Sequence, residues 1–127
     1  KINNFNLKYF PASDGEPSTN QVDVLTEEIK KDHFPDVVIG SRTEDSSGSD
    51  AGSASVMFGP LSGTVDMSGS LAKVLGLNGG DWAGAAVSMG GDINNDGYGD
   101  VMIGTPQLDI GEDYVDIGAV LIMKGGW

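Results

Sequence analysis

The sequence contains no cysteine, one histidine and few basic residues. Without cysteine, disulfides, thiolate metal sites and thiol nucleophiles are excluded. A single histidine gives little support to a catalytic triad, in which a histidine base activates a nucleophile. Seven Lys and Arg stand against 19 Asp and Glu, for a formal net charge of -12. Because such a surface repels phosphate backbones, nucleic acid is not expected as a partner, whereas divalent cations or basic partners are favoured.

Long apolar runs are also missing. No stretch approaches the roughly 20 apolar residues that span a bilayer, and the first ten residues lack the apolar core of a signal peptide. We therefore expect a soluble or already processed chain with no membrane insertion. With 127 residues the chain has the size of one ordinary domain, which leaves no room for a separate catalytic domain.

Glycine is abundant, with 20 residues, and it punctuates two phrases that recur along the chain. An acidic residue, three apolar residues and a glycine occupy 36–40 and again 100–104, a spacing of 64. A glycine-bounded phrase at 52–59 recurs at 118–125, a spacing of 66. Short apolar runs of this kind indicate buried strands. Two matches at nearly one spacing predict an internal repeat built of short strands.

The repeat predicts an all-β fold of two β-propeller blades, each of four antiparallel strands. In the second repeat we expect strands at Ala85–Met89, Val101–Ile103 and Ala119–Met123, with the outer strand missing. In the first repeat Leu71–Leu77 supplies the outer strand, after a turn-rich stretch over 59–69. The predicted division is an N-terminal strand and linker (1–20), a first blade (21–77) and a second blade (78–127). The chain is then part of a longer propeller, or several copies complete one another.

The segment Phe5–Phe10 is an aromatic strand candidate without a blade of its own. Propellers commonly close by completing one blade from both termini, because an unpaired edge is a template for further pairing. We expect this segment to pair with Ala119–Met123, in a neighbouring copy rather than in its own chain. The expected product is a ring or a filament.

The segment 92–100, with the sequence DINNDGYGD, places oxygen-bearing side chains at alternate positions. A curled loop can turn these oxygens toward one point, and calcium takes six to eight such ligands. The predicted ligands are Asp92, Asn94, Asp96, the Tyr98 carbonyl and Asp100, with Gly97 at the sharp turn. The segment is not an EF-hand, because position twelve of that motif is here Ile103. The alternative is a solvated turn that binds no metal.

The second repeat resembles the FG-GAP repeat of the integrin-α propeller. The resemblance rests on WAGAAV at 82–87, GDINNDGYGD at 91–100, VMIGTP at 101–106 and GAV at 118–120. Ala83-Gly84 stands where the family has Phe-Gly, and Gly104-Thr105-Pro106 stands where it has Gly-Ala-Pro. The resemblance implies the same five calcium ligands, an extracellular or cell-surface location, and partner binding through the loop Asp109–Asp116.

The corresponding loop of the first repeat, Glu28–Asp36, is expected to have lost its metal. Lys30 stands in place of Asn94, and His33 replaces the turn glycine. A protonated amine there is a built-in cation opposite the acidic residues of the loop. His33 is interpreted as a loop residue without catalytic duty.

An enzymatic function would depend on loop carboxylates, as in a glycosidase. The candidates are Glu112, Asp113 and Asp116, with Glu44, Asp45 and Asp50 in the first repeat. Nothing in their sequence context sets one apart as an acid, so no catalytic residue is predicted and solvated turns are expected.

We instead interpret Asp109, Glu112, Asp113 and Asp116 as a partner-binding loop. The predicted function is an extracellular adhesion or recognition module for a protein or glycan ligand, or a structural subunit assembled by strand exchange. The alternative is a carbohydrate-binding or carbohydrate-active propeller, in which Trp82, Tyr114 and Trp127 could line a sugar site.

Overall fold

The computed structural model describes residues 5–8, 22–27, 34–66, 70 and 72–126. These residues form strands and loops, and none of them is helical. The strands are β1 (Phe5–Lys8), β2 (Val22–Glu27), β3 (Asp36–Ser41), β4 (Ser53–Met57), β5 (Gly63–Asp66), β6 (Ala72–Leu75), β7 (Ala86–Gly91), β8 (Asp100–Thr105) and β9 (Ala119–Met123). The predicted all-β class is confirmed. Within this part of the chain, no helix could cross a membrane.

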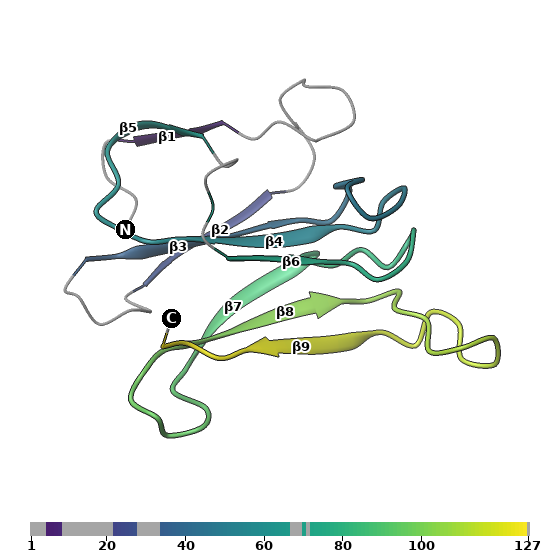
Figure 1. The fold of residues 1–127 in the computed structure, drawn as a ribbon. Coiled ribbons are helices and arrows are strands. Elements are labelled where there is room, and N and C mark those ends of the chain that lie inside the picture. Colours follow the sequence, from purple (N-terminus) through teal and green to yellow (C-terminus); the bar gives the residue numbers. More distant parts are fainter. Residues whose placement is uncertain (1–4, 9–21, 28–33, 67–69, 71, 127) are drawn as a thin grey trace.

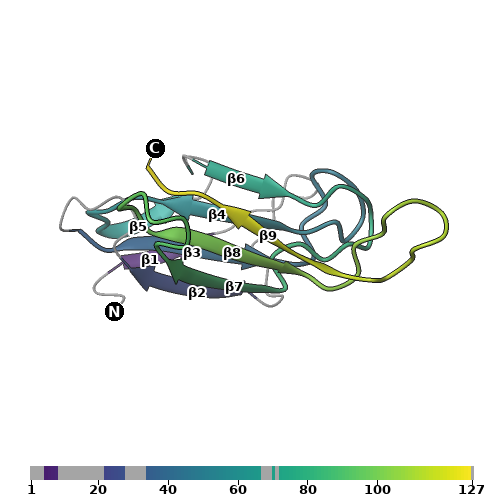
Figure 2. The same ribbon diagram turned by 90° about the horizontal axis from the view of Figure 1, so that it is seen from below.

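The strands form two antiparallel sheets and one short parallel pair. The first sheet has the order β2-β3-β4-β6 and the second the order β7-β8-β9. The two sheets lie face to face, with the β1-β5 pair beyond the first sheet (Figure 1). Seen from below, the axes of the strands in the two sheets are roughly aligned (Figure 2). The predicted outer strand of the first repeat is found as β6, and the three strands expected in the second repeat are β7, β8 and β9.

The two sheets are built on one plan. The recurring phrases form β3 and β8, and β4 and β9, which hold the second and third places in their sheets. An acidic residue begins β3 and β8, and each accepts the same hydrogen bond from a glycine after the third strand. The N–H of Gly59 donates to Asp36 Oδ1 at 3.0 Å, and that of Gly125 donates to Asp100 Oδ1 at 2.9 Å. The spacings of 64 and 66 residues therefore reflect one structural unit that occurs twice.

The core lies between the two sheets. Its buried side chains are Val38, Ala54 and Val56 from the first sheet and Val101 and Ile103 from the second. Strand β3 carries buried apolar residues on both faces, as expected of a strand covered on both sides, whereas Met102 and Gly104 of β8 are only partly buried. Burial of these apolar residues stabilises the pair of sheets at roughly 25 cal/mol per Å² removed from water.

Gly40, in β3, lets the second sheet come close to the first. A Cβ at this position would lie 2.3 Å from the carbonyl oxygen of Gly84 and 3.0 Å from Val87 Cγ1. The residues around Gly84 lead into β7, so the first strand of the second sheet crosses over this glycine. No larger residue fits without moving the backbone of one sheet.

The N-terminal strand has a partner in its own chain that the sequence analysis did not predict, while its pairing with β9 of a neighbouring copy stays a prediction. β1 pairs in parallel with β5 of its own chain, in a register that runs from Phe5 opposite Gly63 to Lys8 opposite Asp66. The partner was missed because 59–69 was interpreted as turns, although Gly63–Asp66 is a strand. One edge of β1 is thus used within the chain. Residues 9 and 10 of the predicted strand lie outside the described residues.

Candidate functional site

The loop 92–99 joins β7 to β8. Its curl is set by three residues in left-handed backbone conformations, one at the end of β7 and two within the loop. Gly91 has a φ of 70°, Asn95 of 58° and Gly97 of 92°. Glycine adopts such angles without steric cost, and asparagine tolerates them better than most residues. The role predicted for Gly97 at the sharp turn is therefore confirmed. The loop is exposed along most of its length.

The first three predicted ligands lie on one side of this curl. Asp92 Oδ1 and Asn94 Oδ1 both accept a hydrogen bond from the Asp96 N–H, at 2.9 and 3.1 Å. Asn94 Nδ2 donates to Asp96 Oδ2 at 2.7 Å. Two side-chain oxygens, of Asp92 and Asn94, thus meet at one backbone amide, and the side chain of Asn94 also contacts the Asp96 carboxylate. The convergence of all five predicted ligands on one point stays a prediction.

The remaining carboxylate oxygens of the loop are oriented by the main chain. Asp92 Oδ2 accepts from the Gly97 N–H at 2.7 Å, and Asp96 Oδ1 accepts from the Tyr98 N–H at 2.9 Å. A carboxylate oxygen that accepts one N–H bond keeps acceptor capacity for a second partner. These oxygens are therefore held in place while they remain available to a cation from the solvent side.

Asp100 stands apart from the other acids because it is buried, with 1% of its surface exposed. Its two oxygens accept N–H bonds from Gly125 at 2.9 Å and from Ile93 at 2.8 Å. The hydrogen bond from Gly125 is the main reason that the pKa of Asp100 lies below its usual value. Burial opposes this shift. The N–H groups of Ile93 and Asn94 and the charge of Lys124 lower the pKa further. Asp100 therefore ties the start of the loop to the end of β9.

The three aspartates of the loop are not gathered into one cluster. Among the described residues, no three Asp, Glu, His or Cys side chains are close enough together to hold a metal ion. The donors are nevertheless all hard oxygens, which suit calcium in kind. The exposed part of the set consists of Asp92, Asn94, Asp96 and the Tyr98 carbonyl, and Asp100 supports the loop from below.

The predicted partner-binding loop projects from the end opposite the 92–99 loop (Figure 1). Glu112, Asp113 and Asp116 are all exposed, and Asp109 accepts a hydrogen bond from the Asp116 N–H at 2.7 Å. Exposed apolar side chains accompany these acids, and they are Ile110, Tyr114, Val115 and Ile117. The loop thus presents a mixed acidic and apolar surface to solvent.

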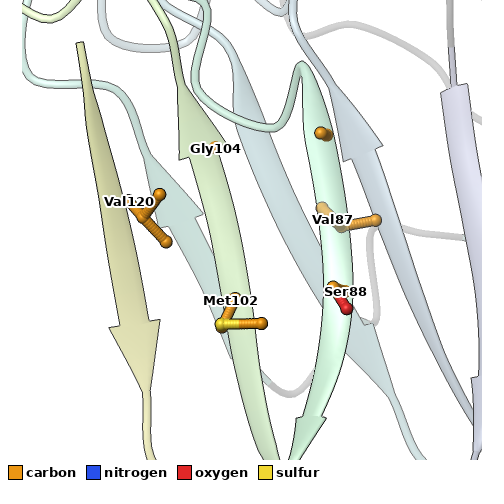
Figure 3. A pocket seen from close by; sticks show the side chains of 6 residues that line it. Val87, Ser88, Met102, Gly104 and Val120 are labelled. Carbon is orange, nitrogen blue, oxygen red and sulfur yellow. The ribbon is translucent and has the colours of Figure 1, made fainter.

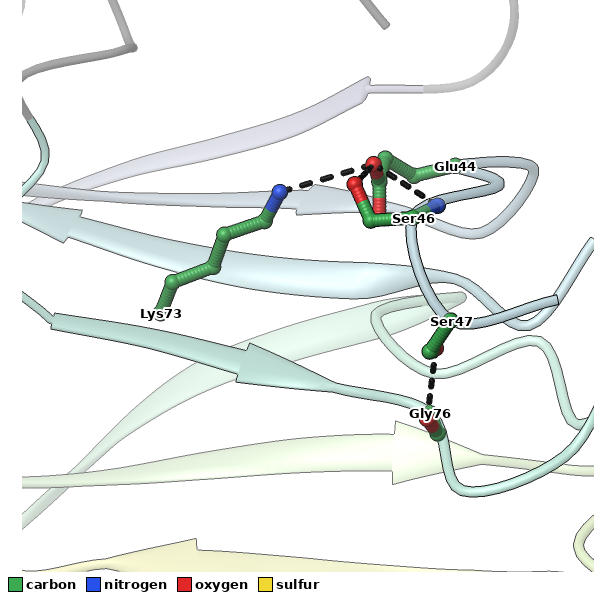
Figure 4. A network of polar contacts seen from close by, with 5 residues as sticks. All are labelled: Glu44, Ser46, Ser47, Lys73 and Gly76. Carbon is green, nitrogen blue, oxygen red and sulfur yellow. Dashed lines mark hydrogen bonds and ion pairs between the residues drawn. The ribbon is translucent and has the colours of Figure 1, made fainter. Parts of the chain in front are cut away.

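Glu44 is a buried acid that sequence reasoning missed, because its loop was expected to be solvated. Only 1% of its surface is exposed. Its Oε1 accepts from the N–H of Ser46 at 3.1 Å and from the Ser46 hydroxyl, and it lies 3.5 Å from Lys73 Nζ (Figure 4). Within the described residues, Oε2 has no hydrogen-bond partner. The signal that could have located it is the repeat itself, because 64 residues later the same place is held by buried Leu108.

Replacing Glu44 by Leu, the residue of the second repeat, is expected to leave stability unchanged or to raise it by about 1 kcal/mol. A buried ion pair that is replaced by an apolar residue of similar volume is often neutral or stabilising. The partners lose little, because Ser46 is exposed and the Lys73 side chain is 34% exposed. Urea unfolding measures the change, and Glu44→Ala is the control that lowers stability by leaving a cavity. A large loss in Glu44→Leu would contradict this account.

The aromatic residues considered for a sugar site do not form an open platform in the described residues. The guanidinium of Arg42 stacks on the Trp82 ring, with Cζ 5.0 Å from the ring centroid. Tyr114 is exposed in the 109–116 loop. Trp127 lies outside the described residues, as do residues 28–33 of the first-repeat loop, with Lys30 and His33.

The two motifs of the second repeat, Ala83-Gly84 and Gly104-Thr105-Pro106, lie close together between the sheets. Ala83 is fully buried and forms a parallel bridge with Gly52 of the first sheet. The N–H of Gly84 donates to the carbonyl of Gly104 at 3.0 Å, and the Thr105 hydroxyl donates to the carbonyl of Asp81 at 2.9 Å. These contacts join the segment before β7 to the end of β8.

Comparison with known families agrees with this unit. The family model described as FG-GAP repeat matches residues 83–123, which contain β7, β8, β9 and both loops between them. No curated protein matches the chain. The chain thus contains an FG-GAP repeat at residues 83–123.

Proposed function

We propose that this chain is a calcium-binding β-propeller module in which the two sheets are consecutive blades. Three observations support the blade interpretation. The sheets share one strand plan, they pack face to face over Gly40, and one of them carries the FG-GAP match. A propeller repeats such units around an axis, with each sheet covering the next.

The observation that carries the calcium proposal is the meeting of the Asp92 and Asn94 side-chain oxygens at the Asp96 amide, with Asn94 also bonded to the Asp96 carboxylate. A cation bound by this loop would balance the negative charges of Asp92 and Asp96. Calcium supplies that charge and fixes the loop between β7 and β8. The residues that hold it in this proposal are Asp92, Asn94, Asp96, the Tyr98 carbonyl and Asp100.

The module acts by recognition rather than by catalysis in this proposal. The 109–116 loop combines exposed acids with exposed apolar side chains, which suits a protein partner with a basic rim around an apolar pocket. The location that belongs to this proposal is extracellular or at the cell surface, where millimolar calcium fills even a weak site. The pairing of β1 with β5 weakens the alternative of a subunit assembled by strand exchange, since β1 already has a partner.

Isothermal titration with calcium tests the metal site directly. We expect one ion per chain, with weaker binding of magnesium because that ion keeps its waters and demands octahedral geometry. Asp92→Asn should weaken the binding strongly, whereas Asp109→Asn, the same change in the other loop, should leave it unaltered. Absence of a calcium signal at millimolar concentration would overturn the proposal, and a second equivalent site would show that the first-repeat loop also binds.

A further inference from the structure

Two loops expose large apolar side chains at the end of the sheets opposite the 92–99 loop (Figure 1). The turn 76–81, which follows β6, carries Leu77, and 73% of the surface of this residue is exposed. The loop 106–118 joins β8 to β9. Its exposed apolar side chains are Ile110, Tyr114, Val115 and Ile117. Together with Leu77 they form a surface that we call the end patch.

Asp81 holds the two loops side by side. It is buried, with 1% of its surface exposed. Its Oδ2 accepts hydrogen bonds from the N–H groups of Leu77 and Asn78, at 3.0 and 2.7 Å. Its carbonyl accepts from the Gln107 N–H at 3.3 Å and from the Thr105 hydroxyl at 2.9 Å. One residue thus fixes both the turn after β6 and the start of the loop after β8.

Hydrogen bonds within the 106–118 loop fix its shape. The Ile110 N–H donates to the Tyr114 carbonyl at 2.9 Å, and the Asp116 N–H donates to Asp109 Oδ1 at 2.7 Å. Leu108 is buried at the base of the loop. A loop that is already ordered loses less conformational entropy when a partner binds it.

The corresponding loop of the first sheet shows that the fold does not require the apolar side chains of the end patch. It covers residues 42–52, between β3 and β4, and contains no large apolar residue. It is nevertheless closed by main-chain bonds, from the Gly48 N–H to the Asp45 carbonyl at 3.2 Å and from the Ala51 N–H to the Gly48 carbonyl at 3.0 Å. The exposed apolar residues of the second loop therefore indicate a contact with another molecule.

The charge around the end patch indicates the chemistry of that molecule. The 106–118 loop carries four acids, which are Asp109, Glu112, Asp113 and Asp116. The sequence has no Lys or Arg between Lys73 and Lys124, so both loops lack basic residues. A partner that places basic groups beside an apolar surface complements this arrangement.

We propose that the end patch binds an amphipathic basic helix of a protein partner, with Leu77 and Tyr114 as apolar contacts and the loop acids paired with Lys and Arg of the helix. The inference rests on the proposed function as a recognition module, and it adds the turn 76–81 to the binding surface. Such a helix presents an apolar strip between two basic rows. Blades of a propeller pack through the faces of their sheets, so loops at the strand ends stay free to bind it.

Titration with two synthetic helical peptides of equal charge tests this proposal. One peptide consists of Leu and Lys and the other of Ala and Lys. The leucine peptide should bind at least about tenfold more tightly, because only leucine buries the apolar side chains of the end patch. Leu77→Ser and Tyr114→Ser should each reduce this preference, and the double variant should abolish it. Both affinities should fall as salt is raised.

Val120→Ser is the matched control. Val120 is 63% exposed but lies on the face of the second sheet, beside an open hollow of about 230 Å³ (Figure 3). This variant should leave both affinities unchanged, and far-UV circular dichroism checks that every variant folds. Equal binding of the two peptides, or no binding, would overturn the proposal, as would a preference that survives the double variant or disappears in Val120→Ser. Because no variant alters the 92–99 loop, a failed calcium titration leaves the proposal standing.

Discussion

Asp96→Ala should abolish the calcium-dependent part of the stability of this protein. Calcium that binds the folded loop and not the unfolded chain stabilises the fold by about 2.7 kcal/mol at 100 times its Kd. For a chain of this size that is a rise in Tm of roughly 10 °C. Asp96 interacts with Asn94 and with the Tyr98 N–H, so its removal takes away a ligand and loosens the curl that positions the others.

The measurement is a set of thermal melts over a calcium titration. The wild type should show a Tm that climbs with calcium, and Asp96→Ala should show a flat line. Asp113→Ala removes the same charge from the exposed 109–116 loop and should keep the full calcium response. Identical calcium responses in the wild type and Asp96→Ala would remove this residue from the site.

Gly40→Ala should destabilise the protein by about 3 kcal/mol or more, whereas Gly104→Ala should have almost no effect. The two glycines hold the same place in β3 and β8, so strand propensity and backbone entropy change alike. At Gly40 the added methyl would lie 2.3 Å from the Gly84 carbonyl oxygen. The methyl carbon is bonded directly to the backbone of β3 and the oxygen belongs to the main chain at Gly84, so neither atom can rotate away. Overpacking of this kind typically costs 1–3 kcal/mol, occasionally more.

Urea unfolding of both variants, at concentrations where the chain is monomeric, provides the comparison. The difference between them isolates the contact between the sheets, because the methyl at position 104 meets only ordinary neighbours. Equal losses in the two variants would mean that glycine is needed for strand geometry and not for the approach of the second sheet.

Local patterns in the sequence were sufficient for the strands β3, β4, β6, β7, β8 and β9 and for the metal-site hypothesis, but at β5 they predicted turns. The apolar runs within 36–40 and 100–104 form strands, since a short run of β-branched residues bounded by glycine favours that conformation wherever it is buried. The Asp92 and Asn94 oxygens meet at the Asp96 amide, because residues so close in sequence are held near one another once Gly97 turns the chain. The 64-residue spacing predicted two units of one plan.

Contacts between distant residues could not be derived in this way. β1 pairs with β5 rather than with β9, and only the folded chain decides between two edges that offer the same backbone groups. Glu44 is buried although its serine-rich surroundings indicate a solvated turn, because β6 brings Lys73 to it from 29 positions away. Asp100 accepts its bond from Gly125, and so it serves as a brace as well as a candidate ligand. Sequence alone thus determined most strands of the two repeats and the spacing of the oxygen-bearing side chains. The tertiary structure decided that Gly63–Asp66 is a strand, which edges meet and which carboxylates leave the solvent, since those outcomes depend on residues far apart in the chain.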